Sequence, residues 1–117
     1  MVCHLTDAFL VAMDQKHASA VRGWHNRTLI KWIALYVPLR WPAGIETVPE
    51  IDQSIGGTKP DDFRMDVGAL EAAMERFLSA AESLPTHRHP IFGAMSTAAW
   101  MRWGYLHMDH HLRQFGV

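Results

Sequence analysis

The stretch WMRWGYLHMDHHLRQF, residues 100–115, decides the predicted fold and raises the main question about function. Trp100, Trp103 and His107 recur at three- and four-residue steps, the spacing of one face of an α-helix. His107 and His111 lie four residues apart, so their side chains point the same way and could hold one cation. The indoles on this face pack into a core, so the two imidazoles need polar partners or a metal there. The stretch therefore predicts a final helix with two candidate metal ligands near its C-terminal end.

Helical spacing of apolar residues extends to the rest of the chain. Pro38 ends one helical segment because the residue before a proline is pushed out of helical geometry, and Ser96 is a good N-cap for the last helix. Pro60, followed by two aspartates, marks the start of another helix. Strand-like alternation is lacking, so the sequence predicts an all-α helical bundle in a single domain, residues 1–117. The expected helices, the first and last ended by Gly23 and Gly116, are at about residues 1–22, 28–37, 61–84 and 96–114.

The composition describes an ordinary core-forming protein. Of its residues 49% are hydrophobic and 20% are charged, and the net charge is −1. This balance gives no electrostatic support for nucleic acid binding. Cys3 is the single cysteine, which excludes an intrachain disulfide. The chain shows no secretion signal and no apolar run approaching the ~20 residues of a membrane helix. We therefore expect a cytoplasmic protein that binds neither nucleic acid nor membranes.

Two histidines at this spacing are a weak signal for a metal site, so a third ligand is needed. The other histidines are His4, His17, His25, His87 and His89. His107 and His111 lie near the end of the last helix, so a ligand from an antiparallel neighbour must lie near the beginning of that neighbour, as His4 does. The long connection of residues 38–60 lets the first and third helical segments run parallel, while residues 85–95 reverse the last one. The side chains expected at the opposite pole are His17, His87 and His89.

A site of His4, His107 and His111 would hold a divalent ion and leave at least one coordination position open. Three neutral imidazoles suit Zn²⁺ or Ni²⁺, with Fe²⁺ or Co²⁺ as alternatives. Such an ion can lower the pKa of bound water for hydrolysis, or hold a thiol as thiolate for transfer. The alternative for His107 and His111 is a pair of neutral, hydrogen-bonded core histidines. His110, as a cation near the helix end, and Asp109 are expected on the solvent side.

Each side chain near these histidines has a functional and a structural interpretation. Asp7, one turn after His4, either accepts a hydrogen bond from that imidazole or is a solvated surface acid. Cys3 points away from His4 and is expected to be a buried, inert thiol. Trp100 and Trp103 are expected in the core, with a pocket wall beside the metal as the alternative.

Two further motifs have no role that spacing alone assigns. The HPIFG motif, residues 89–93, begins with His89, which could brace its loop. A second group of residues mixes basic side chains with tryptophans, as helices that lie at a membrane surface do. The favoured interpretation is that the tryptophans pack under the long basic side chains. This second group comprises Arg22, Trp24, Arg27, Lys31, Trp32, Arg40 and Trp41.

Four segments together resemble the DinB-like superfamily, in a branch of unknown function. They are HLTDAF at residues 4–9, GGTKP at 56–60, HPIFGAMSTAAW at 89–100 and WGYLHMDHHLRQF at 103–115. The resemblance implies a four-helix bundle with an up-down-down-up arrangement and a divalent metal on three histidines. One ligand comes from the second helix and an HxxxH pair from the fourth, which implies His4, His107 and His111. It also implies that the first helix of the bundle is absent here, and an apolar stripe exposed by that absence would favour a homodimer.

The resemblance also indicates a class of reaction. Superfamily relatives include transferases and isomerases that use low-molecular-weight thiols. We therefore expect a metal-dependent thiol S-transferase that acts on a low-molecular-weight thiol and a small electrophilic substrate, without assigned catalytic residues. The alternatives are a metal-dependent hydrolase and a non-catalytic helical interaction module with a vestigial histidine cluster.

Overall fold

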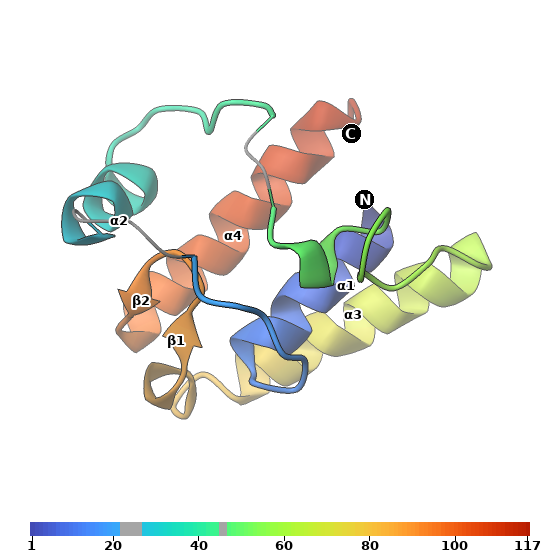
Figure 1. Ribbon diagram of the computed structural model, residues 1–117, viewed down its shortest axis with the longest axis horizontal. Helices are drawn as coiled ribbons and strands as arrows, with labels where there is room; N and C mark the ends of the chain where they lie inside the picture. The colour runs from blue at the N-terminus through green and yellow to red at the C-terminus, as the bar shows by residue number, and fades with distance from the viewer. Residues whose placement is uncertain (22–26, 45–46) are drawn as a thin grey trace.

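The computed structural model describes residues 1–21, 27–44 and 47–117 (Figure 1). These residues form four α-helices, one short β-hairpin and two 3-10 turns. The all-α prediction is confirmed, with a two-stranded hairpin as the one addition in these residues. The helices are α1 (Val2–Ala12), α2 (Arg27–Tyr36), α3 (Phe63–Ser79) and α4 (Thr97–Gln114). The short elements are the 3-10 turns η1 (Pro49–Ile51) and η2 (Leu84–Thr86) and the strands β1 (Arg88–His89) and β2 (Gly93–Ala94).

Helices α1 and α3 run parallel and α4 runs antiparallel to both (Figure 1), as the length of the connections predicts. Their three facing surfaces meet in an aromatic cluster, where the ring of Phe9 lies 5.0 Å from that of Phe77 and 6.0 Å from that of Trp103. Gly104 makes room for this contact, because a Cβ there would lie 3.1 Å from the Phe77 ring. All three rings are buried, so this cluster is the centre of the core.

The first helix is shorter than expected. It ends at Ala12, so the expectation of a helix through residues 1–22 is wrong in its second half. Asp14 adopts the left-handed conformation with φ 57°, and the next backbone N–H donates to the Leu10 carbonyl at 2.8 Å. This is the turn that usually ends a helix at glycine, and aspartate tolerates it better than most residues. The expected end at Gly23 lies outside the described residues.

The other helix ends follow their capping residues closely. The side chains of Asp62 and Ser96 accept hydrogen bonds from backbone N–H groups three residues later, so the predicted N-cap at Ser96 is confirmed and Asp62 is the N-cap of α3, which begins two residues after its expected start. Gly116 has φ 74° and ends α4 as expected. Helix α3 stops at Ser79, five residues before its expected end, because the chain turns through η2 to bury Leu84 completely.

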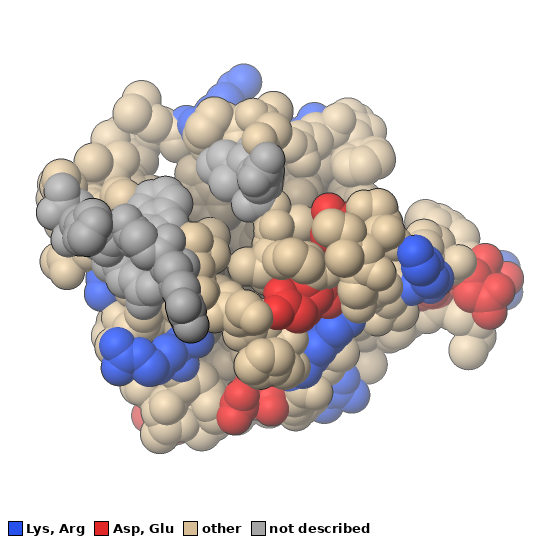
Figure 2. Space-filling model, in the orientation of Figure 1, with Lys and Arg blue, Asp and Glu red and all other residues tan. Residues whose placement is uncertain are grey.

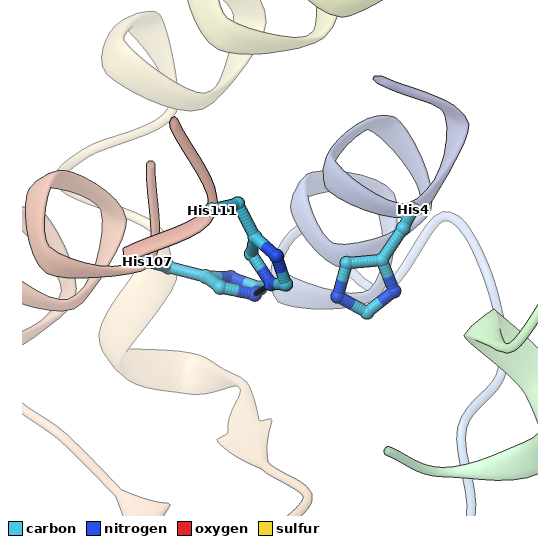
Figure 3. A group of neighbouring side chains, drawn as sticks. All are labelled: His4, His107 and His111. Carbon is cyan, nitrogen blue, oxygen red and sulfur yellow. Dashed lines mark hydrogen bonds between the residues drawn. The ribbon is translucent and has the colours of Figure 1, made fainter. Parts of the chain in front are cut away.

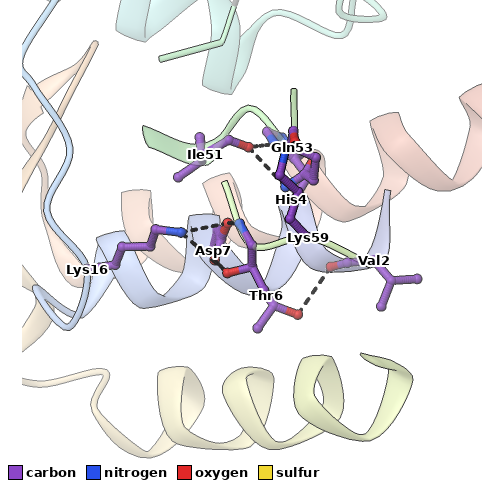
Figure 4. Close-up of polar contacts among 9 residues, drawn as sticks. Val2, His4, Thr6, Asp7, Lys16, Ile51, Gln53 and Lys59 are labelled. Atoms are coloured by element: carbon purple, nitrogen blue, oxygen red, sulfur yellow. Dashed lines mark hydrogen bonds and ion pairs between the residues drawn. The ribbon is translucent and has the colours of Figure 1, made fainter. Parts of the chain in front are cut away.

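The connection of residues 38–60 is fastened to α1 by Asp7 (Figure 4). The Asp7 carboxylate is fully buried and accepts hydrogen bonds from the backbone N–H and the hydroxyl of Thr58, both at 2.7 Å. Lys16 completes the group with an ion pair of 2.8 Å to the same carboxylate. Both expectations for Asp7 are therefore wrong, because it neither bonds to His4 nor faces water. Its charge is compensated in the interior, as a buried carboxylate requires.

Gly57 lies in the turn that this clamp holds, and it gives a stability prediction. A Cβ on Gly57 would lie 2.7 Å from the carbonyl carbon of Asp52 and 2.9 Å from its oxygen. Because both are backbone atoms, the turn itself must shift. We expect Gly57→Ala to lower the free energy of unfolding by about 1–3 kcal/mol in urea denaturation. Gly68→Ala is the control, since Gly68 is exposed on α3 with open space around it, and it should raise the same quantity by ~0.5–1 kcal/mol. Equal stabilities of the two variants would contradict this account.

Helix α2 lies apart from α1 and α3 and contacts the start of α4 and the hairpin (Figure 1). Lys31 donates a hydrogen bond of 2.8 Å to the Ala94 carbonyl, and Arg102 donates to the carbonyl of Leu35. No helix in the described residues is both long and apolar enough to cross a bilayer. Figure 2 shows basic and acidic side chains interspersed over the face that it presents.

Candidate metal centre

His4, His107 and His111 come together between the beginning of α1 and the end of α4 (Figure 3). One ligand nitrogen from each residue lies within 4.8 Å of the other two. The Nε2 atoms of His107 and His111 are 3.1 Å apart, and the ring centroid of His4 lies 5.4 Å and 4.7 Å from theirs. Two nitrogens on one tetrahedral ion would be separated by about 3.3 Å, given bonds of ~2.0–2.1 Å. The arrangement therefore fits a shared cation after only small adjustments.

The orientation of His4 is set by a backbone carbonyl. Its Nδ1 lies 3.0 Å from the carbonyl oxygen of Ile51, at the end of η1. Because a carbonyl can only accept, Nδ1 must carry the proton, which leaves Nε2 as a lone-pair donor. Figure 3 shows this second nitrogen turned toward the other two imidazoles. A hydrogen bond that fixes the tautomer of a histidine in this way is typical of metal ligands.

The environment keeps the α4 pair in the neutral form that binds cations. Burial lowers the pKa of His107 well below its usual value, and the charge of His111 lowers it further. Burial also lowers the pKa of His111 to about 4, with the charge of His4 as the next cause. Nδ1 of His107 is buried without a hydrogen-bond partner among the described residues. At neutral pH both residues are therefore uncharged imidazoles, and a cation could replace the hydrogen bond between their Nε2 atoms.

A cavity of about 740 Å³ opens beside the three histidines. Its described lining comes from α1, α2, the connection of residues 38–60, the hairpin and α4, and is mostly apolar. Trp41, from the connection, lines the cavity beside the site, with its ring centroid 6.2 Å from that of His107 and 5.9 Å from that of His110. Its indole N–H donates to the Ala34 carbonyl at 2.8 Å. The histidines therefore face a partly open, mostly apolar cavity large enough for a small molecule.

The comparison with protein families found a match over residues 4–116, to the family described as "Protein of unknown function (DUF1569)". The chain belongs to the DUF1569 family. The matched range contains all three histidines of the candidate metal centre. The comparisons with curated proteins and with solved structures found no match.

In this DUF1569 protein, His89 lies on the wall of the same cavity, which corrects the expectation that it lies at the pole away from His4. Its ring centroid is 5.2 Å from that of Trp103, which is in turn 5.1 Å from that of His107. The physical reason is that residues 85–95 are not a plain loop but contain a paired β-hairpin. The hairpin of β1 and β2 folds this segment back along α4, with Gly93 at φ 69° as the first residue of β2 after the turn.

The remaining side chains singled out by the sequence divide between core, surface and cavity. Trp100 and Trp103 are buried in the core, as predicted, and both also line the cavity. Cys3 is a buried thiol whose pKa burial raises, in agreement with an inert role. Asp109 pairs with Arg113 at 2.8 Å on the surface.

His110 differs from its expected role as a solvent-side cation. It lines the cavity, and burial lowers its pKa, so the neutral form is favoured. Among the described residues, only the group of His4, His107 and His111 brings three such ligand atoms so close together. Trp41 and the Ile51 carbonyl were not predicted for this site, since both come from a connection without periodicity. His25 lies outside the described residues.

Proposed function

We propose that this DUF1569 protein is a DinB-like metalloprotein in which His4, His107 and His111 hold a divalent ion. Zn²⁺ or Ni²⁺ suits three neutral imidazoles best, with Fe²⁺ or Co²⁺ as alternatives. The observation that carries the proposal is the convergence of three ligand nitrogens within 4.8 Å, one of them held in the ligating tautomer by the Ile51 carbonyl. The proposed reaction is transfer of a low-molecular-weight thiol to a small electrophile. A homodimer and a cytoplasmic location stay predictions.

The donor set fits a catalytic ion better than a purely structural one. Structural zinc sites usually have four protein ligands, whereas three histidines leave a position for an exchangeable ligand. When bound, the ion would lower the pKa of a thiol that reaches this open position and so supply a thiolate at neutral pH. In the transfer, a carbon–sulfur bond forms as the bond from that carbon to its leaving group breaks, and the thiol proton departs with the leaving group. No oxidant or reductant is consumed.

Thiol transfer is preferred over hydrolysis here because of the resemblance to the DinB-like superfamily, and the cavity offers few carboxylates that could act as a general base. Asp52 is the one carboxylate among the described residues that line it. Its Oδ1 already accepts hydrogen bonds from the backbone N–H and the hydroxyl of Ser54, and these bonds lower its pKa. A carboxylate held in this way is a weak general base. Ionisation at the metal would supply the nucleophile without such a base, whether that nucleophile is a thiol or a water molecule.

The proposal is tested by metal analysis of the chain purified without a histidine tag. We expect about one equivalent of divalent metal per chain, removal by a chelator and recovery with Zn²⁺ or Ni²⁺. The loaded protein should consume cysteine in the presence of 1-chloro-2,4-dinitrobenzene faster than the stripped protein does. A chain that neither contains nor takes up stoichiometric metal would overturn the proposal.

A further inference from the structure

His89 is held as a neutral hydrogen-bond donor by its own turn. Its Nδ1 accepts hydrogen bonds from the backbone N–H groups of Ile91 and Phe92, each at 3.1 Å. An imidazole nitrogen that accepts cannot carry a proton, so the proton of the neutral ring lies on Nε2. Burial lowers the pKa of His89 to about 3, so the ring stays neutral at physiological pH. The HPIFG motif therefore builds a fixed donor that does not titrate in the physiological range.

This donor lies on the wall of the cavity that contains the candidate metal centre. No described residue accepts a hydrogen bond from His89 Nε2. The indole of Trp103 lies between the two groups, 5.2 Å from His89 and 5.1 Å from His107, so their ring centroids are no more than about 10 Å apart. A small molecule that reaches the three histidines is thus within range of His89.

The surroundings of the donor indicate what it would bind. Phe92 stacks on the His89 ring with centroids 4.6 Å apart, and Trp100 lies at 5.7 Å. The Trp100 indole N–H is buried without an acceptor among the described residues, so a second donor in this wall is unsatisfied. The described lining includes two charged side chains, Arg40 and Asp52, but neither influences the pKa of His89, for which burial is the cause. A charged group beside His89 would therefore lose its hydration without a neighbouring counter-charge, whereas a carbonyl oxygen would gain a hydrogen bond.

We propose that His89 is a positioning residue that donates from Nε2 to an uncharged carbonyl oxygen of the substrate. The inference rests on the proposed function and narrows its substrate class to a thiol with a largely apolar body. That apolar body carries an amide or similar acyl group. The spacing between this group and the sulfur would let the sulfur reach the metal centre while the carbonyl oxygen reaches His89. The hydrogen bond would orient the thiol without taking part in bond making or breaking.

The test uses the full chain loaded with Co²⁺, whose absorption spectrum reports thiolate coordination. The probes are a homologous series of acetamido-alkanethiols, each compared with the alkanethiol of matched length. We expect one member of the series to bind about tenfold more tightly than its match, the gain expected of one well-placed hydrogen bond. His89→Asn should lose this preference, because the asparagine oxygen can still accept from the turn while no donor remains at the Nε2 position. His87→Asn, the same change two residues away and outside the cavity lining, should keep it.

A second measurement needs no variant. In the Zn²⁺-loaded protein, the NMR signal of the His89 Nε2–H should shift on binding of the preferred acetamido-alkanethiol and stay in place with the matched alkanethiol. The inference is overturned if cobalt is taken up and no spacer length shows a preference, if His89→Asn keeps the preference, or if the signal does not shift. Failure of the unmodified chain to take up cobalt, Zn²⁺ or any other divalent metal would overturn the proposed function as well as the inference, so the two failures are distinguishable.

Discussion

Replacing His107 or His111 with alanine is expected to lower the affinity for Zn²⁺ by more than about a hundredfold. Loss of a residue that merely orients a metal ligand typically costs 10–100-fold in affinity, so loss of a ligand itself should cost at least as much. The two Nε2 atoms are 3.1 Å apart, and neither variant leaves a replacement nitrogen at that point. The measurement is a competition titration against a chromophoric chelator, with metal content determined at the end point.

His110→Ala is the matched control for these two variants. His110 lies on the same turn and lines the same cavity, with its ring centroid 5.0 Å from that of His111. It is not one of the three converging ligands, so its loss should leave the stoichiometry unchanged and the affinity within about threefold of the unmodified protein. A loss of affinity in His110→Ala equal to that in His107→Ala would show that the cluster binds metal by another geometry, or only at its surface.

Asp7→Ala is expected to lower the free energy of unfolding by about 3 kcal/mol. Removal of one partner of a buried ion pair typically costs 3–5 kcal/mol, because the other charge is left uncompensated. Lys16 retains 22% exposure of its side chain, which places the expected cost at the lower end of that range. Thr58 also loses the acceptor for its backbone N–H and its hydroxyl. Urea denaturation followed by circular dichroism gives the value.

Two comparisons separate this effect from a general loss of charge. Asp109→Ala removes an exposed ion pair with Arg113 one turn apart on α4, which should cost ~0.3–0.5 kcal/mol or less. Adding Lys16→Met to Asp7→Ala removes the stranded ammonium and should recover part of the lost stability. A cost for Asp7→Ala as small as that for Asp109→Ala would mean that the clamp does not hold residues 38–60 on α1.

The sequence by itself determined the helical class, the caps of the last helix and the three converging histidines. The N-cap at Ser96 is local, since the capping side chain and the N–H that it bonds lie three residues apart. The pairing of His107 with His111 follows from the helical repeat in the same way. The choice of His4 as the third ligand needed a further argument from topology. The lengths of the connections limit which helix ends can meet, and this limit was enough to place His4 beside the pair on the last helix.

Only the tertiary structure decided how these histidines are supported and what surrounds them. Asp7 has the sequence context of a surface acid, yet Thr58, 51 residues away, brings it a buried set of partners. The Ile51 carbonyl and Trp41 reach the site from a connection with no periodicity, so no pattern could place them. His89 enters the cavity because a two-residue strand pair folds its loop back along α4. Each of these contacts depends on the path of a loop, which is set by packing across the whole domain and not by neighbours in the chain.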